Sequence, residues 1–195
     1  MPIKEPNITV VDSLQNHFLI AMPSLTDKYF NRSVTYILEH GEQGAMGIVI
    51  NQPSNMTFRE LLGQVDEKAI VSENISENII LCGGPVQADR GFVIHELSGT
   101  WNSSTSITED IMVTTSKDIL LAIGKEDGPK NNLLTLGYAG WEAGQLEKEI
   151  QENSWLTIPA SKDILFDLPI HKRWEAAVNK LGIDIWQLTQ QAGRA

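Results

Sequence analysis

The stretch LGYAGWEAGQLEKEI, residues 136–150, decides the fold, because an apolar run turns there into a helix with aromatic, amide and carboxylate groups. Leu133–Leu136 is apolar, which predicts a buried strand that feeds the glycine-rich turn. Trp141, Gln145 and Glu149 recur every four residues, so they share one stripe of the predicted helix. The sequence therefore predicts a strand-to-helix junction with one polar, aromatic edge.

The glycines at this junction admit two interpretations. Backbone amides at a helix N-terminus, approached closely at glycine, suit a carboxylate or phosphate group. Glu142 lies in the predicted first turn and competes for the same amides, which favours tight packing of strand against helix. We interpret the edge as a contact surface for a protein partner or a small ligand, and not as a catalytic centre. Its residues are Tyr138, Trp141, Gln145 and Glu149.

The segments before the junction predict antiparallel strands. Val34–His40 and Met46–Asn51 are rich in Val, Ile and Tyr around a glycine-containing turn, which predicts a hairpin. Ile79–Cys82 and Gly91–His95 partly repeat this pattern around the glycines at 83–84, as a second hairpin would. An internal duplication and generic hairpin composition both explain this likeness.

Capping residues predict the helices that accompany these strands. Thr57 and Glu60 have the spacing of a capping box for a short helix. Ser116 begins a second helix, which stops at Gly124. Near the C-terminus, an apolar face over residues 169–182 predicts a helix with Trp174 in the core. A last helix, capped by Asp184, is predicted to carry a second core tryptophan, Trp186.

The order of these elements predicts an α/β fold of the mixed α+β kind. We expect a compact mixed sheet with antiparallel hairpins and packed helices, formed either as one body or as two lobes. Residues 1–16 are interpreted as a loosely ordered arm with an edge strand around residues 8–11. Residues 17–195 are interpreted as a single domain, with or without a smaller inserted lobe.

Charge and cysteine content restrict the classes of function. Twenty-five acidic and fifteen basic residues give a net charge of −10, which disfavours direct binding to nucleic acid. The basic group 171–173 is flanked by Asp167 and Glu175, so it reads as a charged helix face. A single cysteine, Cys82, is compatible with a reducing compartment, and no apolar run is long enough for a membrane span. We therefore expect a cytoplasmic protein.

The reactive side chains form no recognised catalytic or metal-binding motif. Four histidines are dispersed along the chain, and neither a cofactor nor a metal site is predicted. Cys82 ends an apolar strand and is expected to be a buried, inert thiol. If the two hairpins are neighbours, a group of polar residues converges at one sheet end. This group is His40, Asn51, Arg90 and His95, and hydrogen-bonded histidines with a structural arginine are the favoured interpretation.

Several ordered motifs resemble those of the YqgE/AlgH family of bacterial proteins. They are HFLIAMP at 17–23, EH at 39–40, GAMG at 44–47, GGPV at 83–86, RGF at 90–92, GYAGW at 137–141 and GQLEKEI at 144–150. The resemblance implies a compact mixed α/β fold with two antiparallel-rich lobes in a cytoplasmic protein. Some relatives are described as transcriptional regulators, but the resemblance implies no established reaction.

Two hypotheses of function follow. The first is a non-catalytic binding or regulatory protein, whose partner or small ligand meets the edge around Trp141. The alternative is a hydrolase or transferase that acts on a small anionic substrate, with His40 or Glu149 for proton transfer and Arg90 for charge.

Overall fold

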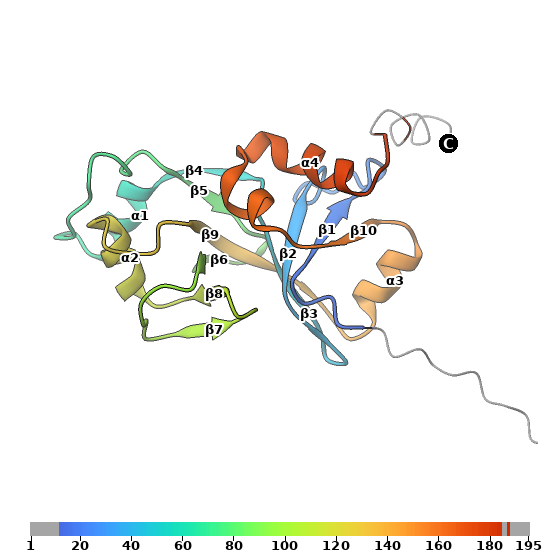
Figure 1. Ribbon diagram of the computed structural model, residues 1–195, viewed down its shortest axis with the longest axis horizontal. Helices are drawn as coiled ribbons and strands as arrows, with labels where there is room; N and C mark the ends of the chain where they lie inside the picture. The colour runs from blue at the N-terminus through green and yellow to red at the C-terminus, as the bar shows by residue number, and fades with distance from the viewer. Residues whose placement is uncertain (1–11, 185–186, 188–195) are drawn as a thin grey trace, which may run out of the picture.

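The computed structural model describes residues 12–184 and 187. Within these residues, ten strands form one curled sheet that helices cover on both sides (Figure 1). The strands are β1 (His17–Ala21), β2 (Val34–Gly41), β3 (Gly44–Val49), β4 (Pro53–Thr57), β5 (Ile79–Cys82), β6 (Val86–Glu96), β7 (Ser104–Ser106), β8 (Ile111–Thr114), β9 (Asn132–Trp141) and β10 (Trp155–Pro159). Between residues 12 and 184 the helices are α1 (Phe58–Val65), α2 (Lys117–Gly124), α3 (Gln145–Gln151) and α4 (Arg173–Lys180). A π-type turn at Asp163–Asp167 and a 3-10 turn at Ile170–Lys172 precede α4.

The sheet runs in the order β10-β1-β2-β3-β9-β6-β8-β7, and β4 pairs with β5 beside it. All pairs are antiparallel except β5 with β9. Strand β9 is central, since it pairs with β6 along one side and with both β5 and β3 along the other. The predicted mixed α/β fold is confirmed.

Strand β9 extends through the glycine motif, so the predicted turn there was wrong. Gly137 has a φ of +76°, and the alternation of side chains along the strand shifts by one residue at this point. Before it, Leu134 and Leu136 pack with α1 and α2; after it, Ala139 and Trp141 pack beneath α3. One strand therefore serves both halves of the same sheet face.

The backbone of the Gly83-Gly84 motif lies directly against β9, which explains the glycine at position 137 of that strand. Gly83 donates its backbone N–H to the carbonyl of Leu136 at 2.7 Å and accepts one from Val49 at 2.8 Å. A Cβ atom on Gly84 would overlap the carbonyl group of Tyr138, and one on Gly137 would overlap the carbonyl of Gly84. The two glycine motifs thus cross with backbone against backbone, as only glycine permits.

The second predicted hairpin is absent among the described strands. Strand β5 pairs with β4 and β9, whereas β6 pairs with β8 and β9. The segment after the first hairpin forms a further strand, β4, which the sequence analysis did not predict. Because β5 and β6 do not pair with each other, the structure gives no support to an internal duplication of the first hairpin.

Three clusters of buried side chains hold the helices on the sheet. Strand residues such as Phe18, Tyr36 and Ile94 pack with α4 on one face. On the other face, α1 and α2 cover one half, and α3 covers the other through Leu146. Thr57 forms both bonds of the predicted capping box at α1. The structure therefore confirms α1, as it does α2, which follows Ser116 as predicted.

The basic group at residues 171–173 is only partly a charged helix face. Arg173 is buried, with 4% of its surface exposed, and Trp174 is in the core as predicted. The predicted arm strand around residues 8–11 and most of the last helix, Trp186 included, lie outside the described residues. Among the helices that the structure describes, none is long and apolar enough to cross a membrane.

Candidate functional site

The carboxylate of Glu149 organises the end of the junction. Its Oε2 atom accepts hydrogen bonds from the indole Nε1 atoms of Trp141 and Trp155, each at 2.9 Å. Its Oε1 atom accepts one from the Gln145 amide at 2.9 Å. Trp141 ends β9 and Trp155 begins β10, so one carboxylate on α3 joins two strands that are not neighbours in the sheet. Three of the sequence-predicted residues therefore meet, although Trp141 is in the strand and not in the helix.

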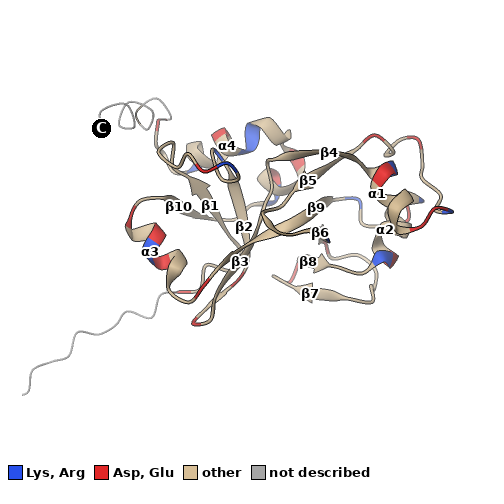
Figure 2. Ribbon diagram, turned by 180° about the vertical axis from the view of Figure 1, so that it is seen from behind, with Lys and Arg blue, Asp and Glu red and all other residues tan. Residues whose placement is uncertain are grey.

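A cleft of about 280 Å³ lies beside this carboxylate. Phe30 also lines it and packs against both indoles, with its ring centroid 5.4 Å from that of Trp155 and 6.3 Å from that of Trp141. The lining residues are Leu25, Asp27, Phe30, Gly140, Trp141, Gln145, Glu149, Ser154 and Trp155. The adjoining helix α3 carries both acidic and basic residues (Figure 2), with Lys148 between Glu147 and Glu149. We call this feature the aromatic cleft.

Burial limits which of these side chains a partner can touch. Trp141 is 7% exposed and Trp155 is 3% exposed, so both indoles are mainly packing residues. Asp27 and Gln145 are exposed at the rim, and Phe30 is partly exposed. Tyr138 lies in the cluster on the opposite sheet face, where its ring meets Phe92 edge-on at 5.8 Å. The continuous edge expected from Tyr138 to Glu149 is therefore interrupted at the sheet.

The predicted helix-end anion site is replaced by a local contact. The N–H of Gln145, the first residue of α3, donates to the carbonyl of Glu142 at 3.0 Å, and the N–H of Glu142 donates back to Oε1 of Gln145 at 3.0 Å. Gly144, at φ +76°, separates the strand from the helix. The helix therefore starts four residues beyond Trp141, later than the sequence suggested.

His40 lies near the junction but is committed to structural contacts. Its Nε2 atom is 2.8 Å from Oε1 of Glu147, and its Nδ1 atom accepts the N–H of Leu14 at 2.9 Å. This pattern places the ring proton of neutral His40 on Nε2. Burial opposes ionisation of Glu147, but the backbone bond and His40 outweigh it, and its pKa is lowered. His40 therefore anchors the segment around Leu14 to β2.

The other predicted polar residues are dispersed. Arg90 is exposed, with its guanidinium 5.2 Å from the Phe92 ring centre and 3.3 Å from the Gln87 amide oxygen. Asn51 accepts the N–H of Val34 and donates to the carbonyl of Arg32, both at 2.8 Å, at the far end of the β2–β3 hairpin from His40. His95 is buried and bonded to Thr114 at 2.8 Å. Their convergence required two neighbouring hairpins, and this condition is not met, because β5 and β6 do not pair with each other.

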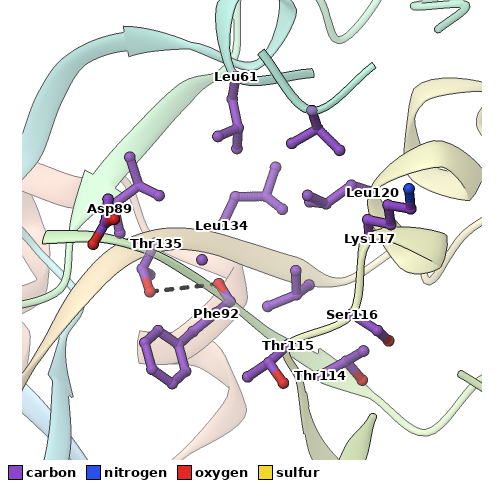
Figure 3. Close-up of a pocket in the computed structure, with 14 residues that line it drawn as sticks. Leu61, Asp89, Phe92, Thr114, Thr115, Ser116, Lys117, Leu120, Leu134 and Thr135 are labelled. Carbon is purple, nitrogen blue, oxygen red and sulfur yellow. Dashed lines mark hydrogen bonds between the residues drawn. The ribbon is translucent and has the colours of Figure 1, made fainter. Parts of the chain in front are cut away.

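Another cavity lies between α1, α2 and the sheet (Figure 3). It measures about 160 Å³, and apolar side chains such as Leu61, Leu120 and Leu134 surround it. Asp89 and Lys117 stand at opposite sides (Figure 3). A space of this size fits one ring or one branched side chain, which is below the usual range for a metabolite site.

Metal and thiol chemistry find little support in the described residues. No group of three His, Cys, Asp or Glu side chains among them is arranged to hold a metal ion. Cys82 is half-buried, so the thiol is less enclosed than the sequence suggested.

Sequence reasoning missed the loop that walls the aromatic cleft. Asp27 and Phe30 belong to the connection between β1 and β2, more than a hundred positions before Trp141. An Asp27 side chain that accepts the N–H groups of Tyr29 and Phe30 gives a local turn signal. That signal predicts the turn but not the strand against which it folds.

Comparison with known proteins places these features in a family context. The sequence profile described as AlgH-like matches residues 18–186. A UPF0301 protein from Shewanella woodyi is 50% identical over 187 residues, covering 95% of this chain and all of the relative. One from Thioalkalivibrio sulfidiphilus is 52% identical over 188 residues, covering 96% of this chain and all of the relative.

Two solved structures are similar as well. The solution structure of the AlgH protein from Pseudomonas aeruginosa is 46% identical, covers both chains completely and aligns with a TM-score of 0.78. A crystal structure of a protein from Corynebacterium diphtheriae is 22% identical, covers 92% of this chain and 90% of its own, and has a TM-score of 0.66. This second likeness concerns the fold alone.

Proposed function

The chain belongs to the AlgH-like family, and from this premise we propose that it is a non-catalytic binding protein whose site is the aromatic cleft. The observation that carries the proposal is the Glu149 carboxylate, which holds Trp141 and Trp155 in place beside an open space. Such a preorganised wall lowers the entropic cost of binding.

The chemistry of the cleft favours a cationic group. Asp27 and Glu149 bring carboxylates to a space walled by aromatic rings, and cations are attracted by both. Glu149 already accepts three N–H bonds, and a carboxylate offers about four acceptor positions. We therefore propose a protein partner that presents a lysine or arginine side chain to Asp27 at the rim.

The alternative of a hydrolase or transferase has less support. His40 is bonded to Glu147, Glu149 to two indoles, and Arg90 lies over Phe92. The three groups proposed for proton transfer and charge thus have separate surroundings. For the compartment we propose the cytoplasm, on the charge of −10 and the single cysteine.

The proposal is tested by titration with small cations, monitored through the indole N–H signals of the protein by ¹⁵N NMR. Arginine amide is the probe, and glycerol and sodium chloride control for neutral binding and ionic strength. We expect saturable shifts of the Trp141 and Trp155 signals with arginine amide alone. Asp27→Asn keeps an acceptor oxygen for the turn but removes the charge, and we expect it to weaken binding about tenfold.

A matched control is Glu142→Gln, which removes an exposed carboxylate outside the cleft lining and should leave binding within about twofold. Equal shifts with sodium chloride, or unchanged binding in Asp27→Asn, would refute the cationic-ligand proposal.

A further inference from the structure

A cavity of about 450 Å³ lies at the end of the β1–β2 loop, where Asn31 and Arg32 border it. It is lined by Asn31, Arg32, Asn51, Gln52, His171, Trp174 and Glu175. Its volume is within the range of small-ligand sites, and nearly all of its lining side chains are polar. It is separate from the aromatic cleft, with which it shares no lining residue.

Arg32 is held in an unusual conformation at this cavity. Its φ is +51°, a left-handed value that costs a non-glycine residue free energy. Asn51 fixes it, because the Asn51 amide donates to the Arg32 carbonyl at 2.8 Å and its oxygen accepts the N–H of Val34. The guanidinium is 5.4 Å from the ring centre of Trp174. The Arg32 side chain thus lies over the ring of a buried tryptophan.

No carboxylate of the described residues pairs with the guanidinium of Arg32. Its only recorded side-chain interaction with the described residues is the contact with Trp174, although Glu175 lines the same cavity. Its planar fork of N–H donors is free to bind an oxyanion in a bidentate manner.

A second, buried arginine adds positive charge at the same end of the molecule. Arg173 precedes Trp174 in the chain and is 4% exposed. Its guanidinium donates to two backbone carbonyls, those of Leu168 and Ile50, and forms no ion pair with the described residues. Burial lowers the pKa of Arg173 to about 10, so it stays charged at neutral pH. Its charge is therefore not cancelled by a neighbouring carboxylate.

From these contacts we infer that the Arg32–Trp174 cavity binds a small metabolite through an oxyanion group, a phosphate or a carboxylate. Arg32 binds the anion, while the amides of Asn31 and Gln52 border the same space as hydrogen-bonding groups. Glu175 is an acceptor in the same cavity, so it suits a ligand that carries a hydroxyl or amino group beyond its anionic end.

The experiment titrates the protein with sodium phosphate and, separately, with sodium acetate, against sodium chloride at equal ionic strength. The ¹⁵N signals of the Arg32 side chain and of the Trp174 indole report binding. We expect saturable shifts of both signals with one or both oxyanions and not with chloride. Phosphate alone, acetate alone, or both would each support the site and would identify the preferred group.

Arg32→Gly is the decisive variant, because glycine adopts the left-handed backbone without strain while the guanidinium is removed. We expect unchanged or higher thermal stability and a loss of oxyanion affinity of at least about tenfold. Lys28→Ala, in the same loop but outside the cavity lining, should bind like the original chain. Shifts that fail to saturate, or that persist in Arg32→Gly, would overturn the inference. Neither result bears on the cationic site, which is tested through Trp141 and Trp155.

Discussion

The Nε2 atom of His40 lies 2.8 Å from Oε1 of Glu147, a contact that links β2 to α3 across 107 positions of the chain. The side chain of His40 is 3% exposed and that of Glu147 is 27% exposed. With the N–H of Leu14 bound to the other ring nitrogen, His40 connects three segments at one point. One imidazole thus links the sheet to α3 and to the segment that leads into β1.

This contact predicts a dependence of stability on acid. Because the pKa of Glu147 is lowered in the folded chain, its ionised form contributes stability above its ordinary pKa of 4.5. That contribution is lost as the pH falls through the lowered folded pKa. Glu147→Gln should therefore be less stable than the original chain at about pH 7, and the difference should shrink as the pH falls below about 4.5.

Urea unfolding of both proteins at several pH values measures this difference. Glu152→Gln is the control, because Glu152 is an exposed residue whose ion-pair contact with Lys148 is 3.9 Å long. A difference that stays constant with pH would show that Glu147 contributes by packing and not by charge.

The Glu149 carboxylate predicts a large stability effect without any ligand. Glu149→Ala leaves the indole N–H groups of Trp141 and Trp155 without their acceptor, at sites that are 7% and 3% exposed. We expect a loss of about 2 to 4 kcal/mol in the free energy of unfolding, and a smaller loss for Glu149→Gln, which keeps one acceptor oxygen. Chemical denaturation measures both losses. A loss below about 0.5 kcal/mol for the alanine variant would contradict a stabilising role of the Glu149 hydrogen bonds to the two indoles.

The elements with local signals could be predicted from the sequence. The capping box at Thr57, the helix after Ser116 and the β2–β3 hairpin each depend on residues close together in the chain. The sequence analysis grouped Trp141, Gln145 and Glu149 by a four-residue helical repeat. In the structure Trp141 is the last residue of β9, so the repeat does not extend to it. The grouping succeeded because Gly144 reverses the chain and returns α3 over the end of β9.

The remaining errors come from contacts between distant segments. The motif around Gly137 looks like a turn because glycine is common in turns, yet Gly137 is needed where β9 meets the backbone of Gly84. Likewise, nothing near Arg32 indicates that Asn51 holds its backbone in the left-handed region. Such positions become visible only when strand pairing is known.

The crossing of the two glycine motifs predicts that alanine is poorly tolerated there. At Gly84 or Gly137 a methyl group would overlap backbone atoms, which cannot move as a flexible side chain can. Both positions also have positive φ, 153° and 76°. We expect each alanine variant to lose at least about 3 kcal/mol or to fail to fold, as measured by thermal melting and soluble yield.

Gly63 supplies the matched control for these substitutions. It lies within α1, and a methyl group there would meet no atom within 4 Å. Gly63→Ala should therefore raise stability by about 0.5 to 1 kcal/mol, as expected for alanine in a helix. A normal melting temperature for Gly84→Ala would mean that the two motifs can separate without cost.

His95 predicts a second pH dependence, in a higher range. Burial lowers the pKa of His95 below its ordinary value of 6.5, and the bond to the carbonyl of Glu96 only partly opposes this. The unfolded chain therefore binds a proton at a higher pH than the folded chain does, so stability falls as the pH decreases from about 6.5. His95→Gln retains an amide that can bond Thr114 but cannot take up this proton. Its free energy of unfolding should vary less between about pH 7 and pH 5 than that of the original chain.

Denaturation curves at half-unit pH steps measure the two slopes over a range where most carboxylates stay ionised. Equal slopes would mean that the folded interior accepts a charged His95 and that the hydrogen bond to Thr114, 2.8 Å long, survives protonation.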